Sequence, residues 1–209
     1  MISNYTELKA AIYKWLVKDN TDSFFDSDMM DNIIFMAEAE LNRRMRVRQM
    51  RDTASVSITA GENASALPTD FIEMYSIWLD SPVQEIQSGS AGIFCRNNYY
   101  LTQGSPELFY LDSGSIVFGP IPDSDYTATV DYYKKITALS DSNATNDILT
   151  DFPDLYLFTC LKHAYIAAQD VEREGVYEQR VALLISEANS KDKKASIAKG
   201  SRGIARSII

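Results

Sequence analysis

The stretch TASVSIT (Thr53–Thr59) marks the point at which the periodicity of the sequence changes. Ala54, Val56 and Ile58 alternate there with hydroxyl side chains, and a two-residue period is typical of a strand with one buried face. Asp112-Ser113-Gly114 then predicts a hairpin turn between residues 108–111 and 116–118, because these residue types tolerate the dihedral angles of a tight reversal. Further β-type stretches, separated by turn residues, are 73–79, 82–86, 93–101, 107–111, 115–118 and 127–134. We therefore expect an antiparallel β-domain over residues 53–138.

Helical periodicity precedes this domain. The spacing of Leu8, Ile12 and Trp15 predicts an amphipathic helix from Thr6 to Lys18. A second helix is expected over residues 28–50, with a buried face formed by Met30, Ile33, Ile34, Ala37, Leu41 and Met45. Together these helices make an N-terminal pair over residues 1–52.

Helical periodicity returns after the polar linker LSDSNATND, which begins at Leu139. Pro153 suits a first helical turn, and the apolar spacing continues to about residue 170. A fourth helix is expected over residues 172–194. The four helices can hide their apolar faces in one bundle, which predicts an α+β fold: a four-helix bundle from residues 1–52 and 139–194, an inserted β-domain, and an extended basic arm over residues 195–209.

The net charge of −9 is distributed unevenly. Residues 191–209 hold six basic side chains and one acidic one, whereas the other 190 residues hold 14 basic and 28 acidic ones. The strong negative charge of these 190 residues repels the phosphate groups of DNA. This argues against a protein that reads DNA sequence. The arm instead combines cations with a terminal isoleucine pair that favours burial on another molecule, and its candidate partner-binding residues are Lys191, Lys193, Lys194, Lys199, Arg202, Arg206, Ile208 and Ile209.

A second basic run closes the second expected helix. Cations at the C-terminal end of a helix are favoured by its macrodipole, and this is the simpler interpretation. The alternative is contact with the acidic surface of a neighbouring subunit. The residues concerned are Arg43, Arg44, Arg46, Arg48 and Arg51.

Catalytic, cofactor and metal motifs are absent from the sequence. The single histidine, His163, follows Cys160 by three residues on one helical face, but a partly buried structural histidine is far commoner than a Cys-His dyad. Cys95 and Cys160 are expected to be plain buried thiols. Acidic pairs such as Glu38 and Glu40 are interpreted as solvated acidic faces. We therefore expect no enzyme activity, cofactor or metal.

Membrane insertion and secretion are likewise not indicated. No apolar run approaches the roughly 20 residues that cross a bilayer. The N-terminal residues MISNYTELKAAIYKW lack the basic and apolar regions of a signal peptide. We expect synthesis in the cytoplasm of the host.

Three stretches carry a resemblance to a known family. LPTDFIEMYSIWL (Leu67–Leu79), after the strand TASVSIT, resembles an element that follows the first β-strand in head-to-tail adaptors of short-tailed bacteriophages, the podovirus tail tubular protein A-like family. Residues 132–164, from the last strand through LSDSN and ILTDFPD, are similar to the junction in that family. The long last helix with its basic tail looks like the C-terminal arm of those proteins.

This resemblance implies a structural virion protein at the head-tail junction. Twelve copies would form a ring beneath the portal, with the arm on the portal protein and the far side receiving the tail nozzle. Genomic DNA would pass through the ring during ejection without sequence-specific binding. An acidic lumen suits that passage, because carboxylates offer no binding sites to phosphates.

Two alternatives stay open from the sequence. The chain could be another head- or tail-completion protein whose arm binds a different ring. It could also be a peptidoglycan-degrading virion enzyme or a hydrolase that uses Cys160 and His163, although no motif supports this activity.

Overall fold

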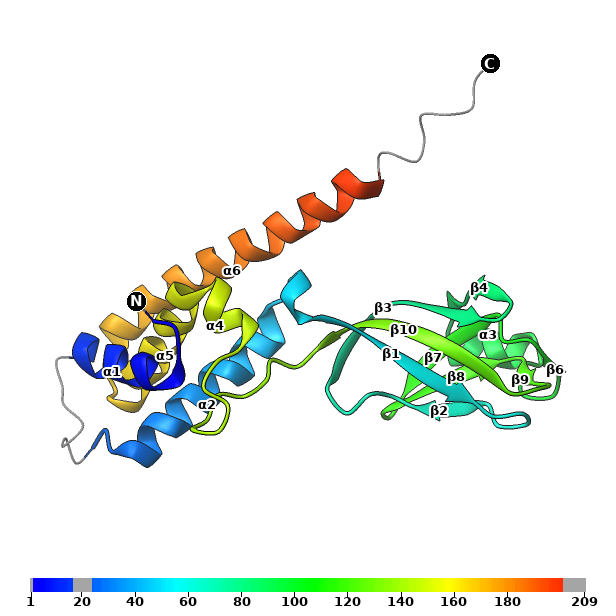
Figure 1. Ribbon diagram of the computed structural model, residues 1–209, viewed down its shortest axis with the longest axis horizontal. Helices are drawn as coiled ribbons and strands as arrows, with labels where there is room; N and C mark the ends of the chain where they lie inside the picture. Colours follow the sequence, from blue (N-terminus) through cyan, green and yellow to red (C-terminus); the bar gives the residue numbers. More distant parts are fainter. Residues whose placement is uncertain (1, 17–23, 201–209) are drawn as a thin grey trace, which may run out of the picture. The chain divides into compact units, whose positions relative to one another are not determined.

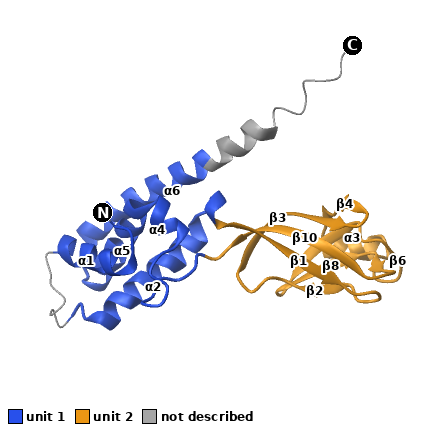
Figure 2. Ribbon diagram, viewed as in Figure 1, with its two compact units in different colours: residues 1–49, 136–209 blue, residues 50–135 orange. Residues whose placement is uncertain are grey.

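The computed structural model describes residues 2–16 and 24–200, with side chains described as far as Lys191. The chain divides into two compact units, shown in Figure 2. Unit 1 consists of residues 1–49 and 136–209, and unit 2 of residues 50–135, so that unit 2 is inserted between the two halves of unit 1. Unit 1 is helical and unit 2 is built mainly of antiparallel strands, which confirms the predicted α+β class.

Unit 1 is organised around one helix. Its described helices are α1 (Tyr5–Leu16), α2 (Ser27–Arg44), α4 (Asp147–Asp151), α5 (Pro153–Ala167) and α6 (Val171–Gly200), labelled in Figure 1. Helix α5 contacts each of the other four. It is apolar on several faces, as expected of a central helix, and Leu155, Tyr156, Cys160, Leu161 and Ala164 are all buried. This arrangement adds α4 to the four helices expected from the sequence.

Helix α2 has the predicted buried face but ends early. Asp26 caps its N-terminus by accepting a hydrogen bond from the Met29 amide at 2.8 Å. Its last residue is Arg44, and a short 3-10 helix, η1 (Arg48–Met50), follows after an extended segment. The side chain of Asn189 on α6 binds the backbone at this ending: its Oδ1 accepts from Arg46 N at 2.9 Å, and its Nδ2 donates to Arg44 O at 3.0 Å.

Helix α6 is longer than the sequence analysis expected. Its backbone continues to Gly200, so residues 195–200 are helical and the prediction of an extended arm there is wrong. No proline interrupts the segment, and glycine is the first strong stop signal after Lys194. On its described part, Val181, Ile185 and Ala188 are buried, whereas Val176 is 64% exposed.

The polar linker is held by asparagine side chains. Asn146 caps α4 by accepting from Leu149 N at 2.8 Å, and its Nδ2 donates to Thr137 O at 2.8 Å. Asn143 Nδ2 donates to Ala138 O at 2.7 Å. The sequence-based prediction here was a polar linker alone, and helix α4 was not predicted.

Unit 2 contains two four-stranded sheets. Sheet A has the order β1 (Arg51–Ile58), β10 (Tyr126–Lys134), β3 (Phe71–Asp80) and β4 (Val83–Glu85). Sheet B has the order β2 (Ala64–Ala66), β8 (Ser115–Gly119), β7 (Leu108–Asp112) and β5 (Gln87–Ser88), and the strands β6 (Gln103–Gly104) and β9 (Ile121–Pro122) form a small parallel pair. The predicted hairpin is confirmed as β7–β8, with Asp112 opposite Ser115. Its turn uses left-handed dihedrals at Ser113 (φ 42°) and Gly114 (φ 87°).

The prediction of a strand over residues 93–101 is wrong. Residues 91–96 form the short helix α3 (Ala91–Arg96), which drives Phe94 into the core and leaves Ile93 and Cys95 exposed. The ring of Phe94 meets Tyr99, Tyr100 and Tyr110 at centroid distances of 5.6, 5.8 and 4.8 Å. The exposed Cys95 also corrects the expectation that both cysteines are buried.

Gly119 packs closely against the ring of Phe94, so a larger residue at this position should destabilise the protein. A Cβ at Gly119 would lie 2.5 Å from Phe94 Cε1, and the fully buried ring has no room to withdraw. We expect Gly119→Ala to destabilise unit 2 by about 1 to 3 kcal/mol. The measurement is urea unfolding followed by Trp78 fluorescence in a Trp15→Phe background.

Gly104→Ala is the matched control. The nearest atom to its added Cβ would be Pro120 Cγ at 3.7 Å, which is ordinary contact. Its unfolding midpoint should stay close to that of the parent, and equal midpoints for both variants would contradict the packing described for Phe94.

Candidate functional site

A group of charges around the buried carboxylate of Glu40 joins three helices of unit 1. Glu40 of α2 is 3% exposed and binds Lys162 and His163 of α5; its Oε2 lies 2.8 Å from His163 Nε2 and also accepts from Lys162 Nζ. Its Oε1 lies 2.5 Å from Arg44 Nη1. Glu178 of α6 completes the group, at 3.0 Å from both Arg44 Nη1 and Lys162 Nζ. We call Glu40, Arg44, Lys162, His163 and Glu178 the charge cluster.

The charge cluster keeps Glu40 ionised. Burial by itself would raise the pKa of Glu40, but hydrogen bonds from His163, Lys162 and Arg44 outweigh it and hold this pKa at about 2. The carboxylate can therefore link helices contributed by the two ends of the chain. This finding corrects the interpretation of Glu40 as part of a solvated acidic face.

The prediction that Glu38 lies on a solvated acidic face is also wrong. It is 4% exposed, and its Oε1 accepts from Tyr156 Oη at 2.6 Å and from the Leu139 amide at 2.8 Å. Burial raises the pKa of Glu38, although these two hydrogen bonds oppose the shift. Its contacts fasten the start of the polar linker to α2 and α5.

Cys160 and His163 do not pair. Cys160 is fully buried, and burial raises the pKa of its thiol, whereas reactive thiols are accessible and have a lowered pKa. The Nε2 atom of His163 is bound to Glu40. These two side chains therefore serve packing and the charge cluster.

The basic run after α2 is largely occupied within the chain. Arg44 belongs to the charge cluster, and Arg46 Nη1 donates to Asn42 O at 2.9 Å and to Met45 O at 2.5 Å. Arg51 pairs with Asp131 and lies over the ring of Tyr75 at 3.6 Å. Arg43 and Arg48 are exposed.

The candidate residues of the arm lie at the limit of the described chain. Lys191 is exposed on α6. Lys193, Lys194 and Lys199 lie on the described helix backbone, but their side chains are outside the description. Arg202, Arg206, Ile208 and Ile209 lie outside the described residues altogether.

Large apolar side chains of unit 1 are exposed in several places. On α2, Phe35 and Met36 are 64% and 51% exposed. Elsewhere, the half-exposed Trp15 packs edge-on against Phe158, with ring centroids 5.8 Å apart, and Phe158 meets Tyr177 at 5.9 Å. Exposed aromatic groups of this kind are typical of protein contacts.

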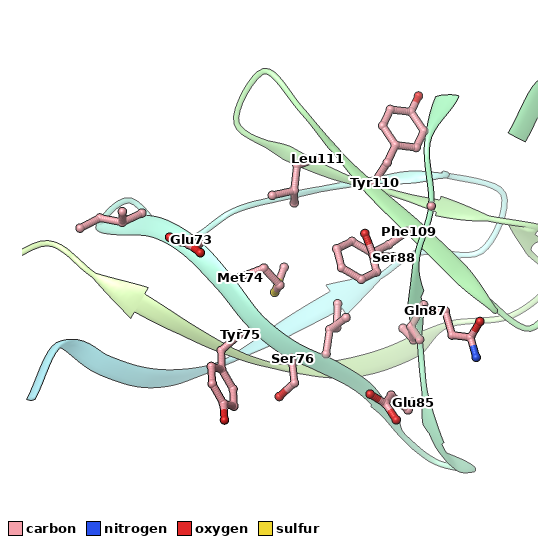
Figure 3. A pocket seen from close by; sticks show the side chains of 14 residues that line it. Glu73, Met74, Tyr75, Ser76, Glu85, Gln87, Ser88, Phe109, Tyr110 and Leu111 are labelled. Carbon is pink, nitrogen blue, oxygen red and sulfur yellow. The ribbon is translucent and has the colours of Figure 1, made fainter. Parts of the chain in front are cut away.

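Unit 2 contains a cleft of about 550 Å³ between sheets A and B. Its walls come from β3, from residues 85–89, which include the end of β4 and all of β5, and from β7. Figure 3 shows Met74 and Leu111 pointing towards each other from β3 and β7. Leu111 at the cleft is 43% exposed, whereas the ring of Tyr75 points away from the cleft in Figure 3 and lies against Arg51 and Tyr133.

Metal-binding and membrane-spanning features are considered next to these surfaces for the described residues. Among the residues that the structure describes, no group of three or more His, Cys, Asp or Glu side chains could hold a metal ion. No helix in the described ranges has the length and apolar character needed to cross a membrane.

The lowered pKa of Glu40 predicts a specific acid sensitivity. The ionised carboxylate stabilises unit 1 fully above about pH 4.5, and this contribution is lost as the pH falls towards 2. We expect Glu40→Gln to cost about 3 kcal/mol at pH 7, because Lys162 loses a buried partner, and the deficit to shrink between pH 4.5 and 2. The measurement is urea unfolding against pH, followed by Trp15 fluorescence in a Trp78→Phe background.

The exposed glutamate Glu187 on α6 provides the control. Glu187→Gln should change the free energy of unfolding by no more than about 0.5 kcal/mol across the same pH range. A Glu40→Gln deficit that is independent of pH would show that the charge on Glu40 does not stabilise the cluster.

Comparison with known proteins completes the description of these surfaces. No curated protein matches the chain. The sequence model of the family described as SU10 adaptor protein matches residues 3–204, which is nearly the whole chain and includes both units. This match confirms the resemblance to phage adaptors drawn from the sequence, and the chain belongs to the SU10 adaptor protein family.

Proposed function

We propose that the protein forms a ring that joins the portal to the tail nozzle of a phage particle. The observation that carries the proposal is the family match over residues 3–204, which makes the chain a phage structural protein. An adaptor acts through its surfaces, and both units expose large apolar side chains suited to contacts. In this proposal the protein is not an enzyme and needs no cofactor.

The C-terminal arm is the proposed portal-binding element. Helix α6 has 30 residues and is twice as long as α5, its main packing partner. The last described contacts of α6 with α2 are those of Asn189. Six of the seven charged residues from Lys191 onward are basic, so the segment would suit an acidic groove on another protein.

The remaining surfaces are assigned to the ring and its channel. Twelve copies would place Phe35 and Met36, or the Trp15–Phe158 group, against neighbouring subunits. The strong net negative charge of the chain outside the arm would keep DNA from adhering to the lumen as it passes. The side of the ring away from the portal would receive the tail nozzle.

Removal of the arm provides the test. A chain truncated after Ser190 keeps Ala188 and Asn189, which complete the described packing of α6, and should therefore retain the unfolding midpoint of unit 1. We expect its binding to isolated portal rings to fall by at least a hundredfold, because both the cations and the terminal isoleucines are lost. Native mass spectrometry of chain and portal mixtures gives the occupancy.

A chain truncated after Gly200 separates the two parts of the arm. If the terminal isoleucines and Arg202 and Arg206 contribute, its portal binding should be intermediate. Unchanged portal binding after removal of residues 191–209 would exclude the arm as the docking element. Binding of the full chain to a tail-completion ring in place of the portal would favour the alternative position in the particle.

A further inference from the structure

Helix α2 carries a stripe of residues on the side opposite its buried face. The stripe has an apolar centre, formed by Phe35 and Met36, and a cation at its C-terminal end. Each member is exposed apart from Ala39, which is partly buried. We call this surface the α2 stripe, and its residues are Asp28, Asn32, Phe35, Met36, Ala39 and Arg43.

Helix α6 carries a second stripe of this kind, opposite the side that buries Val181, Ile185 and Ala188. Its four members are three or four residues apart and all are exposed. We call this surface the α6 stripe, and its residues are Val176, Arg180, Leu183 and Glu187. Arg180 lies over the ring of Phe158, 5.9 Å from its centroid, so the other three members carry the argument below.

The two stripes face away from each other within one copy. Helix α5 packs against both α2 and α6, and its Lys162 binds Glu40 of α2 and Glu178 of α6. Figure 1 shows α2 and α6 on opposite sides of unit 1. Each stripe lies on the far side of its helix from α5, so one copy cannot bring the two stripes together, whereas two copies can.

Helices α2 and α6 run in the same direction through unit 1, from blue to cyan and from orange to red in Figure 1. In agreement, Arg44 at the end of α2 binds Asn189, which lies late in α6. Neighbouring copies in a ring of twelve differ by a small rotation, which changes the direction of a helix little. The α2 helix of one copy would therefore lie parallel to the α6 helix of the next.

Charge sets the register of such a parallel pair. Neither Arg43 nor Glu187 forms a hydrogen bond or ion pair through its side chain with another residue of the described chain. Placing them opposite each other pairs a cation with an anion. At the other end, Asp28 comes level with Glu172 and Arg173, one like and one unlike charge, so this end adds little.

The same register makes the apolar side chains complementary in shape. Ala39 lies opposite Leu183, because each precedes its charged residue by four positions. Phe35 and Met36 then come level with the space between Val176 and Leu183. These four large side chains are each at least half exposed in the single chain. A small residue opposite a large one allows two helices to pack closely.

We propose that the α2 stripe of one copy packs in parallel on the α6 stripe of the next copy, head to tail. The contact uses two different surfaces, and heterologous contacts of this kind generate a closed ring when the rotation closes. Every copy supplies both surfaces in equal number, so each stripe is covered. The inference rests on the proposed ring but goes beyond it, because it names the two helix faces that join the subunits and their register.

Pairing of two α2 stripes is the competing arrangement. Packed antiparallel, they would bring Asp28 of each copy to Arg43 of the other. This symmetric contact stops at a dimer and leaves Val176 and Leu183 of the α6 stripe uncovered. The contact between α2 and α6 covers both stripes and is compatible with a ring.

Cysteine cross-linking tests the contact directly. The variant combines Ala39→Cys with Leu183→Cys in a Cys95→Ser background, which leaves the buried Cys160 as the one native thiol. Copies assembled on isolated portal rings are treated with a short bis-maleimide, and so is the concentrated chain alone. We expect a ladder of linked species extending beyond the dimer in the portal sample. Each single-cysteine variant should give no linked species, because like stripes do not meet.

Charge reversal tests the register. Arg43→Glu and Glu187→Arg should each lower the occupancy of portal rings by about tenfold, because like charges then meet at every contact of the ring. The double variant restores opposite charges, and its occupancy should return to within about threefold of the parent. Native mass spectrometry gives the occupancy, and circular dichroism of each variant must match the parent.

A matched pair of serine variants tests the apolar part. Leu183→Ser should lower the occupancy of portal rings by about tenfold. Ile166→Ser removes a comparably exposed side chain of α5 that belongs to neither stripe, and it should leave the occupancy unchanged. Equal occupancies for these two variants would overturn the role of Leu183 in the contact.

The outcomes distinguish this inference from the proposed function. Rings that assemble on the portal but give no ladder, or in which the double charge variant is no better than the single ones, would overturn the stripe contact while leaving the adaptor proposal intact. Dimers from Ala39→Cys alone, or rescue of Arg43→Glu by Asp28→Arg, would overturn it in favour of paired α2 stripes. A ladder from a concentrated chain that never binds portal rings would support the contact and count against portal docking.

Discussion

The buried carboxylate of Glu40 is the interaction on which the helical unit depends. Residues 50–135 separate α2 from α5 and α6 in the sequence, so the two halves of unit 1 must find each other after the β-unit has been made. Glu40 binds Lys162 and His163 across this separation, and Arg44 and Glu178 extend the charge cluster to α6. Loss of a partner would leave a buried charge unpaired, which is strongly destabilising. The charge cluster therefore fixes the mutual placement of three helices.

The segments that carry the family resemblance have structural roles in this arrangement. Asn143 and Asn146 of the linker bind backbone carbonyls, and Glu38 binds both the Leu139 amide and the hydroxyl of Tyr156. These contacts anchor the chain as it returns from β10 to the helices. The family match over residues 3–204 covers these segments, both units and most of the long α6.

Hydrophobic periodicity correctly predicted elements that bury only one face. The apolar face of α2 and the β7–β8 hairpin follow directly from the sequence, because a repeat of 3.6 or two residues reports one buried side. The strand prediction for residues 93–101 was wrong. β-branched and aromatic side chains such as those in this segment favour strands, but here Phe94 is buried among three tyrosines from a short helix. The buried positions of Glu38 and Glu40 were not predictable, because Leu139 and Tyr156, which bind Glu38, and Lys162, which binds Glu40, lie more than 100 residues away. Asn146 before Ile148 and Leu149 is a helix-cap signal from which α4 could have been predicted.

In the proposed assembly, the charge cluster keeps unit 1 rigid while exposed surfaces make the contacts between subunits. The most direct test is an electron microscopy reconstruction of the phage particle at the head-tail junction. The account predicts a closed ring of twelve copies between portal and nozzle, with α6 directed to the portal. Density for this chain elsewhere in the particle, or as separate copies without contact between neighbours, would contradict it.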